Sequence, residues 1–353
     1  MSNPWIWKGS VTDEPCFDNL LAVLNRERPA RPTLFEFYLN PDLESTLAGL
    51  PQVGEPTWAR SIRAFAAAGY DYACMFPQNG FRFPKKEHAH EQTISLNDQA
   101  MIHDRASFEA YPWPDPDSLD YSYLDTAAQY LRSGQKLMPA CPGGVLENAI
   151  ALVGFEHLCN LLADDPELVQ DIFDAIGSRL VAYYRQVLRH DTVGFVMVND
   201  DWGFKTQTML SPKQMRKLVF PWHERIVATA HAAQRKAVLH SCGNLTAVMD
   251  DIIDGMKFDG KHSYEDNITK VEDVAERWGK RIAILGGIDV HFMVGRSPRE
   301  IYERAVALVA RGQACGGYAL GTGNSVPSYI PQDHYFAMIE AVVATRRRAA
   351  VAA

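Results

Sequence analysis

The stretch VGFVMVND at residues 193–200 is an almost continuous apolar run that ends in an asparagine and an aspartate. A second run, KAVLHSC at residues 236–242, has the same character and ends in a histidine, a serine and a cysteine. Near-continuous apolar runs of this length are typical of parallel strands that are buried on both faces. The two stretches therefore predict a parallel α/β protein in which polar residues gather where the strands end.

Further β-rich runs alternate with amphipathic helical segments on both sides of this pair. Together they give eight candidate strands: PTLFEFYL (32–39), YDYACMF (70–76), QKLMPAC (135–141), VGFVMVND (193–200), KAVLHSC (236–242), FDGKHS (258–263), RIAILGG (281–287) and GYALGT (317–322). Eight strand–helix units in one chain predict a single (β/α)8 TIM barrel. The alternative is an open doubly wound sheet, although no G-x-G-x-x-G motif opens a helix after a strand.

The predicted barrel occupies residues 31–345. We expect residues 1–30 to form a helical extension ahead of it and residues 346–353 to form a tail. No low-complexity linker interrupts the chain, so a single domain is expected.

The composition limits the class of protein. The chain has 353 residues, of which 47% are apolar and 22% charged, enough to bury a large core. The formal charge of −8 argues against a nucleic-acid partner, which needs a basic patch. No apolar run reaches the roughly 18 residues of a membrane span, and the six cysteines are too sparse for a disulfide framework. We therefore expect a cytoplasmic protein that acts on a small molecule.

Polar residues collect where the predicted strands end, and in a TIM barrel this face carries the active site. Buried carboxylates and imidazoles are costly unless they are paired or bound to a metal ion. A functional site is therefore expected at this rim. The rim residues considered as site residues are Glu36, Glu147, Asp200, Asp201, His240, Cys242, His262, Asp289 and Asn324.

His240 and Cys242 form the sharpest pair, because residues at i and i+2 of a strand point to the same face. An imidazole and a thiolate are two zinc ligands. A buried cysteine beside a hydrogen-bonded histidine explains the pair equally well. His262 and Asp201 end the flanking strands and are the nearest candidates for a third ligand. Cys315 precedes the eighth strand and would lie near the opposite mouth of the barrel.

The other rim residues have structural as well as functional interpretations. Asp200 and Asp201 alternate in direction, so at most one faces the barrel axis, where it could orient substrate or act as a base. His262 could be a ligand, an acid–base group or a satisfied rim residue. We expect Asp201 and His262 to be the catalytic residues. The expected substrate-binding residues are Glu36, Glu147, Asp200, Asp289 and Asn324.

Five blocks between about residues 160 and 340 resemble the uroporphyrinogen decarboxylase superfamily. They are LLADDPELVQDIFDAI, NDDWG followed by MLSPKQMRKLVFPWHERI, VLHSCGN, ILGGIDV and YALGTGNSVPSYIPQDHYFAMIEA. The superfamily includes the decarboxylase itself and zinc-dependent cobalamin methyltransferases that act on methylated corrinoid proteins. Its members are TIM barrels, in agreement with the strand count.

The chain departs from the decarboxylase pattern in three places. RPARPTLFEFYLNPDLES lacks the arginine motif that grips propionate groups, and CMFPQNGF has no equivalent of the aspartate that gathers the pyrrole nitrogens. The decarboxylase block L-G-H-G is LGTG here, with Thr322 in the histidine position. Tetrapyrrole decarboxylation is therefore not expected.

The methyltransferase branch carries H-x-C and a distant cysteine as zinc ligands. His240 and Cys242 match the first part, but Gly323 or Asn324 stands where the distant cysteine belongs. The resemblance therefore implies either that a ligand from a neighbouring strand completes the site or that metal binding is lost. We expect that a ligand from a neighbouring strand takes the place of the distant cysteine.

The resemblance implies a zinc-dependent enzyme that moves a methyl group between a small methylated thiol, ether or hydroxyl compound and a corrinoid. The corrinoid would be carried by a partner protein, and the resemblance is also compatible with a homodimer. Two alternatives remain open at this stage. One is a metal-independent decarboxylase or lyase of a small carboxylated substrate, and the other is a non-catalytic small-molecule-binding protein on the same fold.

Overall fold

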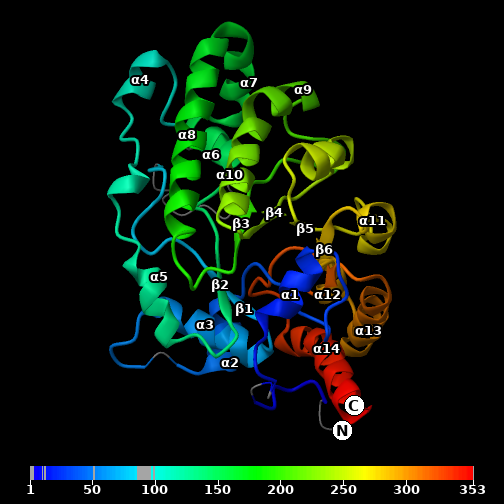
Figure 1. Cartoon of the computed structure of the whole chain (residues 1–353). Helices are drawn as coiled ribbons and strands as arrows, with labels where there is room; N and C mark the ends of the chain where they lie inside the picture. The colour runs from blue at the N-terminus through cyan, green and yellow to red at the C-terminus, as the bar shows by residue number, and fades with distance from the viewer. Residues whose placement is uncertain are drawn as a thin grey trace.

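Parallel strands at the centre and helices around them define the architecture (Figure 1). The computed structural model describes residues 4–9, 11, 13–50, 52–85, 97 and 100–352. The strands are β1 (Tyr72–Met75), β2 (Lys136–Pro139), β3 (Phe195–Asn199), β4 (Lys236–His240), β5 (Gly260–His262), β6 (Ala283–Leu285) and β7 (Tyr318–Ala319). β1 pairs with β2, β3 to β7 pair in chain order, and a bridge from Leu137 to Val193 joins the two sets. Every one of these pairings is parallel.

The segment predicted as the first strand closes the barrel through isolated bridges. Leu34 pairs with Leu320, beyond the end of β7, and Leu39 pairs with Val326. On the other side, the hydroxyl of Tyr72 on β1 accepts the Glu36 N–H and donates to the Glu36 carbonyl. The eight predicted strand segments thus lie in their expected order, and the TIM barrel is confirmed.

The register of the sheet brings the polar strand ends together. Asn199 pairs with His240, and His240 pairs with His262. Three neighbouring strands therefore end at the same level of the barrel, so side chains that follow them meet at one mouth.

Helices cover the outside of the barrel, and α8 and α10 run side by side beside β3 (Figure 1). Between α9 and α10 the chain makes a π-helical turn at Met215–Val219. The helices are α1 (Phe17–Leu24), α2 (Pro41–Ala48), α3 (Thr57–Ala68), α4 (Arg105–Ala110), α5 (Ser122–Thr126), α6 (Val145–Val153), α7 (Phe155–Asp164), α8 (Pro166–Val187), α9 (Pro212–Gln214), α10 (Phe220–Ala232), α11 (Val271–Trp278), α12 (Val290–Gly295), α13 (Pro298–Cys315) and α14 (Gln332–Ala352).

Local sequence signals set where the long helices begin. Asp165 caps α8 by accepting the Leu168 N–H, and Pro166 follows at the first helical position. Ser297 and Glu300 form a capping box at the start of α13. Such caps satisfy N–H groups that have no partner inside the helix. They therefore fix the residues at which α8 and α13 begin.

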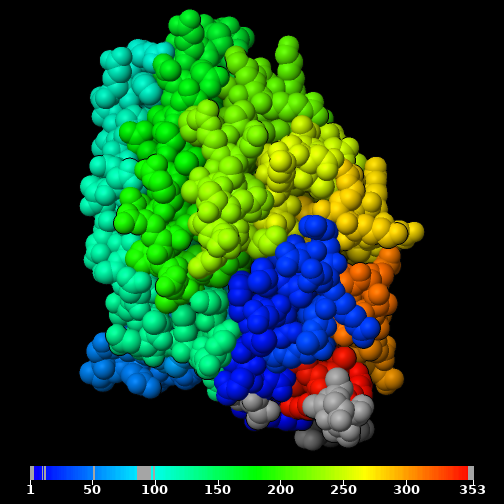
Figure 2. Space-filling view, viewed as in Figure 1, coloured from blue at the N-terminus to red at the C-terminus, as the bar shows by residue number. Residues whose placement is uncertain are grey.

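The two ends of the described chain pack against each other. The N-terminal extension contains α1, and Trp7 ahead of it stacks on Phe336 of α14 with ring centroids 5.2 Å apart. Figure 2 shows the blue N-terminal residues beside the red C-terminal helix. α14 continues through the expected barrel–tail boundary at residue 346. Arg346 inside it is buried and donates to the carbonyls of Pro32 and Gly69, so this part of the expected tail belongs to the packed barrel.

Within the described residues, no single helix combines the length and apolarity needed to cross a membrane. α6 and α7 pass that test only as a pair, and they are bent by 92° at their junction.

Candidate metal centre

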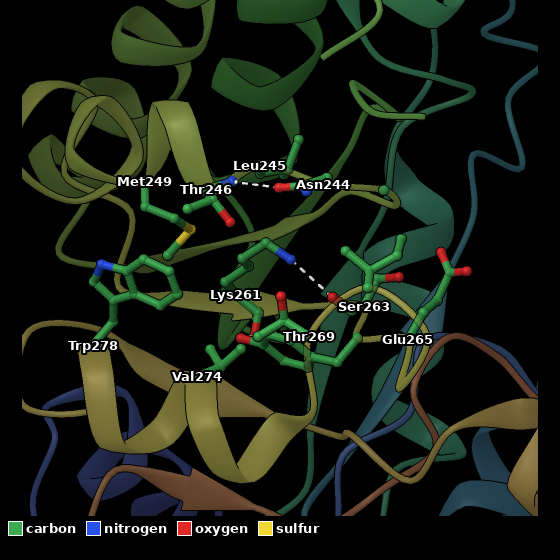
Figure 3. A pocket seen from close by; sticks show the side chains of 13 residues that line it. Asn244, Leu245, Thr246, Met249, Lys261, Ser263, Glu265, Thr269, Val274 and Trp278 are labelled. Atoms are coloured by element: carbon green, nitrogen blue, oxygen red, sulfur yellow. Dashed lines mark hydrogen bonds between the residues drawn. The ribbon is translucent and has the colours of Figure 1, made fainter. Parts of the chain in front are cut away.

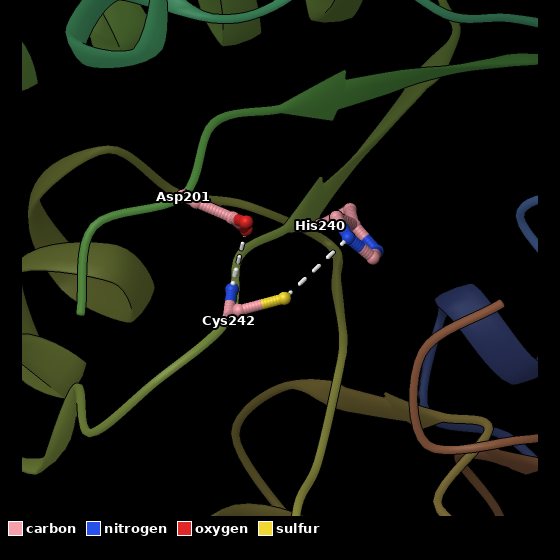
Figure 4. Close-up of side chains that lie close together, drawn as sticks. All are labelled: Asp201, His240 and Cys242. Carbon is pink, nitrogen blue, oxygen red and sulfur yellow. Dashed lines mark hydrogen bonds between the residues drawn. The ribbon is translucent and has the colours of Figure 1, made fainter. Parts of the chain in front are cut away.

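Three side chains converge where β3 and β4 end (Figure 4). One ligand atom from each of Asp201, His240 and Cys242 lies within 4.8 Å of the other two. Cys242 Sγ lies 3.9 Å from His240 Nε2, and Asp201 Oδ1 accepts the Cys242 N–H at 2.8 Å. His240 and Cys242 therefore point to the same place, as the i and i+2 spacing predicted, and Asp201 joins them from the neighbouring strand.

Two glycines allow this approach. Gly203 lies two residues after Asp201, and Gly243 lies directly after Cys242. The backbones of the two glycines are in contact. A Cβ on Gly243 would lie only 2.1 Å from the Gly203 carbonyl oxygen, and Gly243 has a φ of +86°, which favours glycine. The turns after β3 and β4 can therefore lie against each other, and this holds Asp201 next to Cys242.

His262 orients the ring of His240. Their Nδ1 atoms lie 2.8 Å apart, and His262 Nε2 lies 3.3 Å from the Thr322 carbonyl oxygen. Because a carbonyl only accepts, His262 carries its proton on Nε2 and accepts on Nδ1. His240 must then carry its proton on Nδ1, which leaves the lone pair of Nε2 facing Cys242 and Asp201.

The chain of hydrogen bonds continues to a carboxyl in the barrel interior. Glu36 is fully buried, and its two oxygens bond the backbone N–H and the hydroxyl of Thr322 at 2.6 and 2.8 Å. Burial raises the pKa of Glu36 to about 8, although the hydrogen bonds from Thr322 act in the opposite direction. Glu36 thus supports the segment that orients His262 and His240.

The Cys242 sulfur also receives hydrogen bonds from outside the cluster. Ser263 Oγ donates to Sγ at 3.3 Å and Asn324 Nδ2 donates at 3.4 Å. These donors are suited to a thiolate, which is the form of cysteine that binds a metal. Asn324, one of the two positions at which the resemblance places the distant cysteine, therefore contacts the sulfur.

The electrostatics of the cluster favour a cation. Burial raises the pKa of the Cys242 thiol and of the Asp201 carboxyl, and it lowers the pKa of His240 well below its usual range. A divalent ion would compensate for burying a thiolate and a carboxylate side by side. The donor set of imidazole nitrogen, thiolate sulfur and carboxylate oxygen fits zinc.

Asp200 points away from this cluster, as the alternation along the strand predicted. Its two oxygens accept the N–H groups of Leu146 and Glu147 at the start of α6. His223 Nε2 lies 2.8 Å from Asp200 Oδ2, and both side chains are fully buried. Asp200 thereby fixes α6 and α10 against the end of β3.

Glu147 lies in the first turn of α6, between Asp200 and Asp201. It accepts the Gly144 N–H at 2.9 Å in a capping arrangement. Burial, together with the negative charges of Asp200 and Asp201, raises the pKa of Glu147 to about 8. The Glu147 carboxyl is therefore a neighbour of the cluster that tends to keep its proton.

The structure does not bring the other candidates to the cluster. Both oxygens of Asp289 accept backbone N–H groups, from Phe292 in α12 and from Asp266. Cys315 ends α13, before β7, and its side chain is exposed.

Sequence reasoning missed Lys261, Ser263 and Phe37. The Phe37 ring packs on His240 with centroids 4.6 Å apart. Lys261 lies on β5 and is buried although lysine carries a charge. Ser263, two residues later, has a φ of +84°. A lysine inside the otherwise uncharged end of FDGKHS was the available signal, since a lysine is rarely buried without a function or partners.

The fold and the site are those of a TIM barrel with a candidate metal centre at the carboxyl ends of its strands. The family model described as "Uroporphyrinogen decarboxylase (URO-D)" matches residues 90–345, so the chain belongs to the uroporphyrinogen decarboxylase family. This confirms the resemblance seen in the sequence.

Two relatives are similar over most of the chain. A uroporphyrinogen decarboxylase from Alkalilimnicola ehrlichii is 24% identical over 257 residues, which cover 68% of this chain and 67% of the relative. A methyltransferase from Methanosarcina mazei has a solved structure with a TM-score of 0.68 and 15% identity, covering 94% of this chain and 98% of the other. At that identity, the second likeness shows the fold alone.

Proposed function

We propose that this protein is a zinc-dependent methyltransferase with Asp201, His240 and Cys242 as its metal ligands. The observation that carries the proposal is the convergence of these three donors, with the His240 lone pair turned toward the other two. The structural similarity to a methyltransferase from Methanosarcina mazei supports the reaction class. We propose a small methylated thiol, ether or hydroxyl compound as the substrate.

Bound zinc would supply Lewis acidity, which lowers the pKa of a substrate thiol or hydroxyl or polarises an ether bond. His262 and Thr322 keep His240 in the tautomer that offers Nε2. Glu147 is a carboxyl beside the centre that tends to keep its proton, so it can donate that proton to the thiolate or alkoxide that remains when the methyl group leaves. Asn324 contacts the Cys242 sulfur, and its amide would also contact a substrate bound beside that sulfur.

We further propose that a partner protein presents a corrinoid at the mouth of the barrel. Large apolar side chains are exposed in or after four of the strand segments: Tyr38, Phe76, Phe204 and Tyr329. Exposed apolar surface is typical of an interaction site. This arrangement supports a large partner that covers the mouth during transfer.

Elemental analysis of the purified protein tests the metal centre directly. We expect about one zinc per chain in the wild type, as in other catalytic zinc sites, and its loss in H240A and C242S. C159S is the matched control, because Cys159 is an exposed cysteine of α7 outside the cluster. Methyl donors are then screened with free cob(I)alamin as acceptor. A metal-free H240A/C242S double variant with full activity would overturn the proposal.

Decarboxylation is the second candidate function. It is favoured by the uroporphyrinogen decarboxylase from Alkalilimnicola ehrlichii, which is similar over 257 residues. This alternative predicts protein without stoichiometric zinc that releases CO₂ from a small carboxylated substrate in the presence of a chelator. Loss of CO₂ release on chelation would exclude it.

A further inference from the structure

We propose that Lys261 is a positioning residue of the metal centre, and that it holds the turn after β5 in the conformation from which Ser263 donates to Cys242. This inference rests on the proposed metal centre. It assigns a role to a buried lysine that none of the chemistry described above uses.

Lys261 ties together the turns that follow β4 and β5. It lies on β5 and is 4% exposed. Its Nζ donates to the Ser263 carbonyl at 2.8 Å (Figure 3). It also donates to the carbonyls of Ser241 and His262 at 3.3 and 3.4 Å. Ser241 lies between the proposed ligands His240 and Cys242, at the end of β4, so one ammonium group links the segment that carries these ligands to the segment that carries Ser263.

Ser263 has a backbone conformation that needs such support. Its φ of +84° lies in the left-handed region, which is uncommon for residues other than glycine. A conformation of this kind persists only where the surrounding structure fixes it. The hydrogen bond from Lys261 to the Ser263 carbonyl provides this restraint. In this conformation, Ser263 Oγ reaches Cys242 Sγ at 3.3 Å.

The groups around Lys261 come from both turns that it joins. The acidic groups that face Lys261 are Cys242, Asp201 and Glu265, and the Tyr264 ring centroid lies 4.5 Å from Nζ. This position between the turns suits a residue that holds them together.

Lys261 acts through the turns and does not hold a ligand of its own. It lines a pocket together with Asn244, Thr246 and Thr269 (Figure 3). An ammonium group has three protons, and three carbonyl oxygens are within hydrogen-bond distance of this one. The pocket therefore receives no unsatisfied donor from Lys261.

The test measures Co(II) binding to the whole protein, because Co(II) bound to a thiolate has a charge-transfer band that reports on the sulfur. We expect K261M to fold, to bind Co(II) about 10- to 100-fold more weakly than the wild type, and to shift this band. The matched control is K236M. Lys236 lies on the neighbouring strand β4 and pairs with Asp259 at 2.9 Å, at the opposite end of the strand from His240. K236M should bind Co(II) as the wild type does.

A second variant keeps the inference testable if K261M does not fold. In S263G, glycine accepts the positive φ but removes the hydroxyl, so we expect the same direction of band shift in a folded protein. In K261M/S263G, the two effects should be less than additive, because K261M is expected to displace the Ser263 hydroxyl that S263G removes.

The outcomes separate the two proposals. A wild-type protein that binds no Co(II) overturns the metal centre and the role of Lys261 with it. A wild type that binds Co(II), together with K261M and S263G variants of unchanged affinity and spectrum, overturns the role of Lys261 alone.

Discussion

Asn324 Nδ2 lies 3.4 Å from Cys242 Sγ, so a carboxamide contacts the sulfur of the candidate metal centre. An oxygen of Asp201 lies within 4.8 Å of the same sulfur. The centre thus brings one sulfur donor and one carboxyl oxygen together beside an amide.

Substituting Asn324 by cysteine should strengthen metal binding. N324C places a second sulfur next to the first, and we expect zinc affinity to rise about tenfold or more because soft thiolates favour zinc. Competition with a chromophoric chelator measures the affinity. S325C is the control, since it adds a thiol at the adjacent position, and it should leave the affinity unchanged. Equal affinities of N324C and the wild type would contradict the placement of Asn324 at the centre.

Removing the imidazole of His262 should weaken the metal site without unfolding the barrel. H262L takes away the acceptor of the His240 Nδ1 proton, so the His240 ring loses its fixed tautomer. Loss of such an outer hydrogen bond typically costs about 10- to 100-fold in metal affinity. H231L is the control, because His231 pairs with Asp259 away from the centre. Metal titration of both variants checks the prediction, and unchanged affinity of H262L would refute it.

Glu36 should make the protein less stable as pH rises. Its pKa is raised from 4.5 to about 8 in the folded state, so the folded protein keeps a proton that the unfolded chain has released. The stability contributed by Glu36 is therefore fully present below pH 4.5 and is lost as pH rises to about 8, at up to about 1.4 kcal/mol per pH unit. Urea unfolding of the wild type and E36Q across this range measures the difference, and E36Q should show the shallower fall. Parallel curves for the two proteins would contradict the prediction.

The Asp200–His223 pair should be important for stability. D200N keeps the shape of the side chain but weakens two helix-capping bonds and the contact with His223, all of them buried. We expect a loss of about 3 kcal/mol in the free energy of unfolding. D254N breaks an exposed contact with Arg281 and should cost about 1 kcal/mol or less. Urea denaturation of both variants compares them, and equal losses would argue against a special role for the buried pair.

The fold could be predicted because its signals are local and repeated. Each of the eight segments has its own apolar run, and their order along the chain is their order in the barrel. The first segment forms isolated bridges at Leu34 and Leu39 and no regular strand. Its apolar pattern is the same for both arrangements, so it could not distinguish them. The boundary expected at residue 346 was drawn from composition, whereas tertiary contacts of Arg346 carry the helix across it.

The candidate site could be predicted in part, because strand alternation determines direction. Spacing along β4 placed His240 beside Cys242, and alternation after β3 separated Asp201 from Asp200. The positions of Lys261 and Ser263 depend on long-range hydrogen bonds and on one left-handed residue. The lysine in FDGKHS indicates a buried charge, but nothing in this segment encodes the partners of that lysine or the left-handed backbone of Ser263.

The burial of Arg346 has a practical consequence for anyone who makes shortened versions of this protein. A gene fragment cut at the apparent end of the barrel pattern would delete the guanidinium that binds the carbonyls of Pro32 and Gly69, and two acceptors near the barrel floor would lose their donor. We expect such fragments to express as aggregates, and fragments that retain Arg346 to stay in solution.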